Sequence, residues 1–139
     1  MPQPIQYDAG HLNLAPRFFH TSTVAGSPAL AAETTIATLT ISGDLAMLDA
    51  AHVLAFAAFT IGTSGTSYRL RIRRDTIAGL TIADSGLVNA TAANLVAPMI
   101  YGFDTTALGV AQIYVCTLTI AAGAAVSTVS AVNMLTVAV

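Results

Sequence analysis

The chain has 139 residues, of which 55% are hydrophobic and only 9% are charged, and it contains no lysine. Its net charge of −2 argues against a nucleic-acid-binding protein, because phosphate binding requires a clear cationic excess. A single domain with so few charges exposes much apolar surface, which predicts an obligate oligomer or a subunit of a larger assembly.

Residues 1–31 differ from the rest of the chain. They hold four of the five prolines, so a regular central strand or helix is not expected there. Tyr7, Phe18 and Phe19 nevertheless make the segment too apolar for a free linker. We therefore expect an extended N-terminal arm over residues 1–31 that docks on a neighbouring surface, with a disordered leader as the alternative. No signal peptide is expected, because the first residues lack its basic and apolar regions.

From residue 32 onward, apolar and polar residues alternate in short runs that are typical of strands. Residues 34–41 form the first such run and end in a Ser-Gly-Asp turn. Residues 44–62 fit two interpretations. Apolar positions at helical spacing would make a helix, whereas alternation predicts a turn over 44–51 and a strand over 52–61. We favour the strand, which would be apolar on both faces.

The most regular alternation lies between Ser67 and Asp75, where Tyr68, Leu70 and Ile72 alternate with arginines. Four of the five cationic residues of the chain lie in this stretch, and we take them as candidate interaction residues: Arg69, Arg71, Arg73 and Arg74. Two interpretations stay open. The arginines either contact carboxylates of a neighbouring subunit, or they form a solvated outer face whose long stems cover apolar surface.

The remaining strands are expected at 80–83, 87–92, 95–103, 111–120 and 126–139, with Pro98 marking an edge or a bulge. In total, about eight strands separated by short turns predict an all-β protein, an antiparallel sandwich or barrel. The strands at 52–61 and 111–120 are apolar on both faces. In an antiparallel sandwich the outer face should be polar, so another copy of the chain is the simplest cover for these strands.

No residue pattern indicates catalysis, a cofactor, a metal site or a small-molecule substrate. The histidines have no cysteine or second carboxylate at ligand spacing, and the carboxylates stand mostly in turns. Cys116 lies in an apolar run and is interpreted as a small buried hydrophobe. Residues 107–126 are uncharged and long enough to span a membrane, but polar residues interrupt them and no cation flanks them, so we expect a strand and no membrane partner.

Seven runs of the sequence carry a resemblance to a known group of proteins: 39–44 (LTISGD), 48–49 (LD), 53–60, 68–75 (YRLRIRRD), 82–86 (IADSG), 114–120 and 126–133 (VSTVSAVN). In this order they resemble small jelly-roll proteins of tailed-phage virions, namely head-decoration (cement) domains and fibre or spike heads of the TNF-like trimer type. The resemblance implies a jelly-roll β-sandwich domain over 32–139, preceded by the arm over 1–31. It also implies a three-fold assembly through apolar sheet faces.

These expectations combine into a function. The chain is expected to be a non-enzymatic virion structural protein, a trimeric decoration or cement subunit that binds and stabilises the phage head. Its partners would be copies of itself and, through the arm, the major capsid protein or neighbouring virion subunits. It would be made in the host cytoplasm and reside on the capsid surface. The alternative is a receptor- or glycan-binding fibre or spike head; a coat jelly roll and a β-sandwich hydrolase stay open as further readings.

Overall fold

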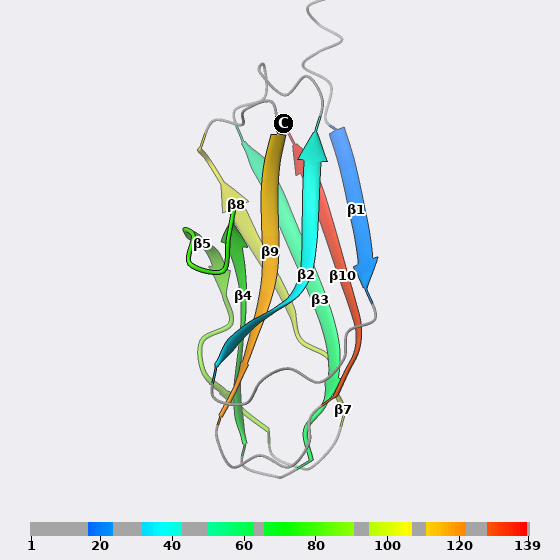
Figure 1. Cartoon of the computed structure of the whole chain (residues 1–139), viewed down its shortest axis with the longest axis vertical. Coiled ribbons are helices and arrows are strands. Elements are labelled where there is room, and N and C mark those ends of the chain that lie inside the picture. Colours follow the sequence, from blue (N-terminus) through cyan, green and yellow to red (C-terminus); the bar gives the residue numbers. More distant parts are fainter. Residues whose placement is uncertain are drawn as a thin grey trace, which may run out of the picture.

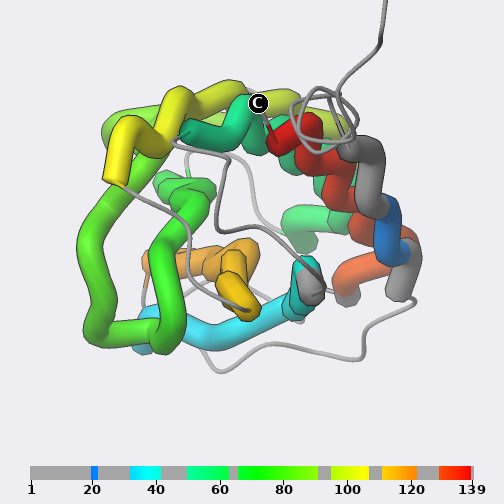
Figure 2. The backbone as a smooth tube through the Cα atoms, turned by 90° about the horizontal axis from the view of Figure 1, so that it is seen from above, coloured from blue at the N-terminus to red at the C-terminus, as the bar shows by residue number. Residues whose placement is uncertain are grey.

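The computed structural model describes residues 17–23, 32–42, 50–62, 66–90, 95–106, 111–121 and 128–138. These residues form two antiparallel sheets that face each other, as the end-on view in Figure 2 shows. Sheet A consists of β1 (Arg17–Thr23), β10 (Thr128–Ala138), β3 (Ala51–Thr60), β7 (Leu95–Val96) and β8 (Met99–Asp104). Sheet B consists of β2 (Glu33–Ser42), β9 (Ala111–Ile120), β4 (Ser67–Arg74), β5 (Thr81–Asp84) and β6 (Val88–Asn89).

The strand order identifies the sandwich as a jelly roll. Sheet A has the order β1-β10-β3-β8 and sheet B the order β2-β9-β4-β5, with β7 and β6 as short additions beside β3 and β4. The first four long strands therefore alternate between the sheets, and the later strands return along them in reverse (Figure 1). This arrangement of antiparallel strands in two sheets is the jelly-roll architecture. The predicted all-β sandwich is confirmed, with ten strands in the described residues instead of about eight.

Several predicted elements match the observed ones closely. β9 covers the predicted 111–120, and β3 is a strand and no helix, because every second residue from Ala51 to Phe59 is fully buried. Pro98 lies between β7 and β8, and its carbonyl accepts a hydrogen bond from Ala57 N at 3.1 Å. The chain thus uses the proline at a break between two short strands, where no ladder hydrogen bond is lost. Residues 43–49 lie outside the described residues.

β1 is the strand that the sequence did not reveal. It is the outer strand of sheet A and pairs with β10 along its whole length, from Arg17 opposite Ala138 to Thr23 opposite Val132. The strand occupies the proline-free stretch between Pro16 and Pro28, which explains how a proline-rich segment still contributes to a sheet. The sandwich therefore includes residues 17–23, which the sequence analysis assigned to the arm.

The core lies between the sheets and is almost entirely hydrocarbon. The inward positions of β3 are small, with Ala51, Ala55 and Ala57 fully buried beside Val53 and Phe59. Sheet B supplies larger partners, among them Leu70, Ile72, Leu118 and Ile120, all with no exposed surface. Large residues facing small ones let the two layers interlock at the density of a protein interior.

Gly102 marks the place where β8 of sheet A meets β5 of sheet B. A Cβ atom at this position would lie 2.7 Å from the carbonyl oxygen of Ile82 and 2.8 Å from its Cγ2. The glycine is therefore required by the close approach of two backbones and not by an unusual turn.

We expect the substitution Gly102→Ala to lower the free energy of unfolding by about 1–3 kcal/mol, because the added methyl group must push β5 away from β8. Urea denaturation followed by circular dichroism measures the change. An unchanged unfolding midpoint would contradict the close approach seen here.

Candidate interaction surfaces

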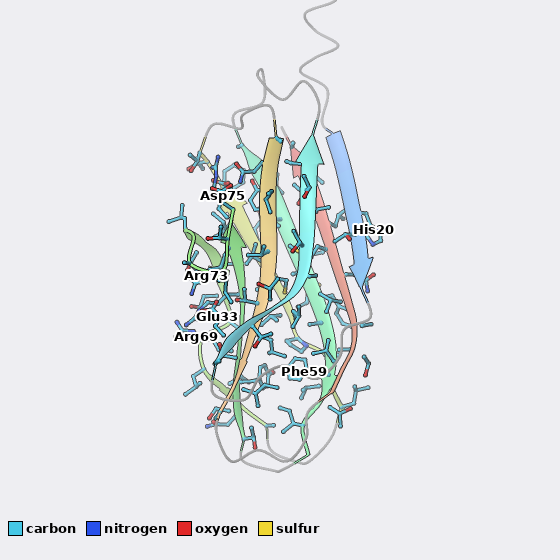
Figure 3. All side chains as sticks on the ribbon, viewed as in Figure 1. His20, Glu33, Phe59, Arg69, Arg73 and Asp75 are labelled. Carbon is cyan, nitrogen blue, oxygen red and sulfur yellow. The ribbon has the colours of Figure 1, made fainter. Side chains whose placement is uncertain are left out.

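The arginines of the stripe on β4 form ion pairs within the chain. On one side, Glu33 of β2 accepts hydrogen bonds from Arg71 Nη1 at 2.8 Å and from Arg73 Nε and Nη2 at 2.7 Å. On the other side, Asp84 of β5 accepts from Arg69 Nε at 2.8 Å and from Arg71 Nε at 3.0 Å. Figure 3 shows Glu33 between the labelled Arg69 and Arg73. Arg71 therefore links the two carboxylates across the strand. We call these five residues the outer ion network.

The network changes the acidity of its carboxylates. Hydrogen bonds from Arg73 are the main cause that lowers the pKa of Glu33 from 4.5 to about 2. Asp84 has a pKa far below its usual range, mainly because of Arg69 and then also because of the Gly86 backbone N–H. Both carboxylates are thus held in their charged form at neutral pH, in charge-assisted bonds of the strong bidentate kind.

The outer ion network also covers apolar surface. Arg71 and Arg73 stand opposite Thr117 and Val115 of β9 in the register of sheet B. These two outward residues are 0% and 5% exposed. Because a guanidinium group reaches beyond its hydrocarbon stem, the arginines can bury the outer face of β9 while keeping their charge paired. The middle of this outer face, predicted to need a second copy as cover, is covered by the chain itself, whereas Ile113 is 36% exposed.

Arg74 serves a different purpose from its neighbours. Its Nη1 donates to both oxygens of Asp104, at 3.0 and 3.2 Å, and Asp104 is 2% exposed. Tyr114 OH also donates to Asp104, at 2.9 Å, and burial together with this carboxylate raises the tyrosine pKa well above its usual range. These contacts join β4 and β9 of sheet B to β8 of sheet A. Arg74 thus ties the two layers together at one end of the sandwich.

Asp75 continues this junction. Its backbone has φ of 66°, a left-handed conformation that aspartate tolerates better than most residues. The side chain accepts a hydrogen bond from Gln112 Nε2 at 2.7 Å, and the backbone N–H donates to Ile113 O at 2.8 Å. The turn after β4 is therefore fastened to β9, which fixes where the arginine strand ends.

The outer face of sheet A is built differently, from uncharged rows that cross β8, β3 and β10. The register places Phe103 beside His52 and Val137, then Tyr101 beside Leu54 and Leu135, then Met99 beside Phe56 and Asn133. We call these nine residues the sheet A face. The outward positions of the three strands that the structure describes carry no Asp, Glu, Lys or Arg. Met99, Tyr101 and Phe103 are 65%, 57% and 47% exposed.

An aromatic cluster occupies one end of the sheet A face. The His52 ring stacks on Phe103 with a centroid distance of 4.5 Å and on Tyr101 at 5.9 Å. His52 Nδ1 and Tyr101 OH are 2.6 Å apart and share a hydrogen bond. The phenol and one imidazole nitrogen thus satisfy each other, so the cluster offers mainly ring carbon to the surroundings.

The other predicted interaction residues lie around sheet A or outside the described ranges. Phe18 and Phe19 are on β1, opposite Val137 and Thr136 in the register, whereas Tyr7 is outside the described residues. Whether any of these residues, or the arginines, contacts a partner stays a prediction. The sheet A face could not be predicted from the sequence, because alternation alone does not tell which strands are neighbours or in which register they pair.

The chemistry of the described residues adds no other site. Within the described ranges no three His, Cys, Asp or Glu side chains gather as metal ligands, and no helix there is long and apolar enough to cross a membrane. Cys116 is fully buried in sheet B, and burial raises the pKa of its thiol to about 12. A thiol held protonated in this way is a poor nucleophile.

Two solved structures are similar to this chain. One is a structure of infectious bursal disease virus, Gx strain. Its matched chain is 13% identical to this one in sequence, and the alignment has a TM-score of 0.53 and covers 90% of this chain and 32% of the matched chain. The other is the VP2 subviral particle of infectious bursal disease virus, which is 11% identical, with a TM-score of 0.51 over 87% of this chain and 32% of that chain. The chain therefore shares a jelly-roll fold with part of each of these two structures.

The similarity to these two structures covers only part of each of them. The chain spans 32% of the length of each of these two proteins, and at 11–13% identity the likeness concerns the fold alone. An arabinose-bound α-L-arabinofuranosidase also aligns, but its TM-score of 0.35 is too low to bear on fold or function. No protein-family model and no curated protein matches the chain.

Two buried threonines provide a matched test of the outer ion network. Thr117 Oγ1 donates to Glu33 Oε1 at 2.5 Å, whereas Thr136 Oγ1 is buried with no hydrogen-bond partner among the described residues. We expect Thr117→Val to lower the free energy of unfolding by about 1–3 kcal/mol and Thr136→Val to raise it by about 1 kcal/mol. Chemical denaturation of both variants measures the two changes in the free energy of unfolding. Equal effects of the two substitutions would argue against a stabilising bond to Glu33.

Acid should weaken the fold through the same network. The pKa of Glu33 is about 2 in the folded chain and near 4.5 when unfolded, so the unfolded state binds more protons in this window. Its contribution is complete above about pH 4.5 and is lost as the pH falls towards 2. Thermal unfolding between pH 6 and pH 2, compared with Glu33→Gln, measures the effect. The variant should show a shallower pH dependence, and identical slopes would contradict the assignment.

Proposed function

We propose that this protein is a non-enzymatic structural protein of a virion, a subunit that stabilises a shell by associating with copies of itself and with neighbouring subunits. The observation that carries the proposal is a capsid-type jelly roll whose sheet A face is apolar and without charge in the described residues. Such a face is unfavourable in water and favourable in an assembly, at about 25 cal/mol per Å² of apolar surface removed from water.

The finer form of the proposal is a trimeric decoration or cement subunit of a tailed-phage head. The resemblance of residues 39–44, 48–49, 53–60, 68–75, 82–86, 114–120 and 126–133 to decoration and fibre-head domains supports it. In this form the segment before β1 reaches the major capsid protein or an adjacent subunit, and the sandwich makes the contacts between copies. The protein would act on the capsid surface by burying apolar area, with no substrate, cofactor or nucleic acid involved.

A receptor- or glycan-binding fibre head is the second candidate, and one observation bears on it. Tyr101 and Phe103 are exposed aromatic residues of the kind that sugars stack on. Their rings, however, stack on His52 at interplanar angles of 20° and 27°, so one face of each ring is already used. The Tyr101 hydroxyl is also paired already, with His52 Nδ1. This arrangement favours contact with another apolar surface over a sugar hydroxyl array, and a glycan array would detect the alternative directly.

A truncation separates self-association from shell binding. Deleting residues 2–16 removes the part of the arm that precedes β1 and keeps β1, whose pairing with β10 belongs to the sandwich. We expect light scattering to give about three times the mass of its own chain for each form, and the full-length chain has a mass of 14.2 kDa. Co-sedimentation with shells of the same virus's major capsid protein should be lost only in the truncated form.

Two outcomes would contradict this proposal. A full-length chain that stays monomeric at 100 micromolar would remove the oligomeric subunit. A truncated chain that still binds shells as tightly as the full chain would remove the role of the arm.

A further inference from the structure

We infer that the sheet A face is the contact between copies of this chain, each copy placing this face against the sheet A face of a neighbour around the symmetry axis of the assembly. The inference rests on the proposed function, because it names the interface of the assembly proposed above. It goes further in choosing one face of the sandwich and excluding the other.

The first step is the difference between the two outer faces. Sheet B covers its central strand with its own side chains, since the stems of Arg71 and Arg73 lie over β9 and their charges are paired with Glu33 and Asp84. Val115 and Thr117 are consequently buried in the single chain. Sheet A has no equivalent layer over β3 among the described residues. The side chains of His52, Leu54 and Phe56 are only partly buried, and the neighbouring residues of β8 are exposed.

The second step is charge. A partner packed on sheet B would have to desolvate the outer ion network, in which Arg69 still has a 40% exposed side chain. Removing paired charges from water carries a large penalty that their attraction only partly offsets. Two sheet A faces brought together would bury no charged group of the described rows. A second copy therefore offers an occupant that matches this face in both polarity and charge.

The third step is area. Met99, Tyr101, Phe103 and Leu135 are 65%, 57%, 47% and 38% exposed. Taking roughly 200 Å² for a fully exposed side chain of this size, these four expose roughly 400 Å² together. A standard interface buries about 800 Å² on each partner, so four residues provide about half of it. The partly exposed rows of β3 and β10 lie between and beside them and extend the same surface.

The aromatic cluster gives the contact a centre. Residues that dominate association are usually aromatic side chains that enter a water-free contact with their polar atoms satisfied. Tyr101 is suited to such a contact, because its hydroxyl is paired with His52 while the residue stays 57% exposed. The cluster is also ordered by stacking before any partner arrives, so association loses little side-chain freedom there.

A charge placed on either face tests the inference in the full-length chain. Tyr101→Glu and Met99→Glu put a carboxylate on the sheet A face at positions exposed in the single chain, so both should fold. Leu80→Glu is the matched control, at a 62% exposed leucine just before β5 of sheet B. Sedimentation velocity from 1 to 100 micromolar gives the dissociation constant, and thermal unfolding verifies the fold of each variant.

We expect the two sheet A variants to weaken self-association by at least roughly 100-fold, because each interface would then bury unpaired carboxylates. Leu80→Glu should associate like the wild type. If the wild type assembles and both sheet A variants assemble equally well, the inference is overturned while the proposed function stands. If all three variants dissociate alike, the contact is not specific to this face, which also overturns it. A wild-type chain that never associates would instead overturn the proposed function together with the inference.

Discussion

A strand that is apolar on both faces must be shielded from water on both sides. The side chains that shield the outer side of β9 also connect several strands of sheet B. One side of β9 faces the core, where Cys116, Leu118 and Ile120 are fully buried. The other side lies beneath the outer ion network, in which Arg71 links Glu33 and Asp84. The network joins β2, β4 and β5 over a distance that backbone pairing alone does not span, since β9 separates β2 from β4. Charge and hydrocarbon in the same arginine side chains make this possible.

The two sheets thus illustrate two solutions to one problem. In sheet B, a few charges concentrated on one strand, with carboxylates supplied by its neighbours, shield the outer face within a single chain. In sheet A, the outer rows of β3, β8 and β10 stay apolar and uncharged in the described residues. The low charge content of the whole sequence is therefore not spread evenly. It reflects one face whose middle is covered by the chain's own arginines and one that another copy would cover.

Local patterns in the sequence were sufficient for most strands but not for their partners. The alternation of Tyr68, Leu70 and Ile72 with arginines defines β4 and its inward face, because side chains alternate with a period of two. The same alternation cannot tell that Arg73 meets Glu33, which lies forty residues earlier in the chain. That contact depends on the order β2-β9-β4, a non-local property of the jelly roll. From the sequence, two surroundings were considered for the arginines, a partner's carboxylates and solvent. The third possibility, carboxylates of the same chain, was not considered.

β1 shows the opposite kind of error. Prolines at positions 2, 4, 16 and 28 suggested an arm over the whole of residues 1–31, yet the seven residues from Arg17 to Thr23 pair with β10. Proline excludes a central strand only at its own position and its immediate neighbours, so a short proline-free stretch can still form an edge strand. Gly102 was equally invisible in the sequence, because its requirement comes from Ile82 across the sandwich.

The central claim is that arginine side chains cover the middle of the outer face of sheet B in the single chain, while the sheet A face is covered by a neighbouring copy. Hydroxyl-radical footprinting of the wild-type chain at 1 and at 100 micromolar, read residue by residue by mass spectrometry, tests it most directly. The claim predicts that the reactivity of Met99, Tyr101, Phe103 and Leu135 falls at the higher concentration, while that of Leu80 and Leu87 is unchanged. Equal reactivity of the sheet A residues at both concentrations, or protection confined to sheet B, would contradict it.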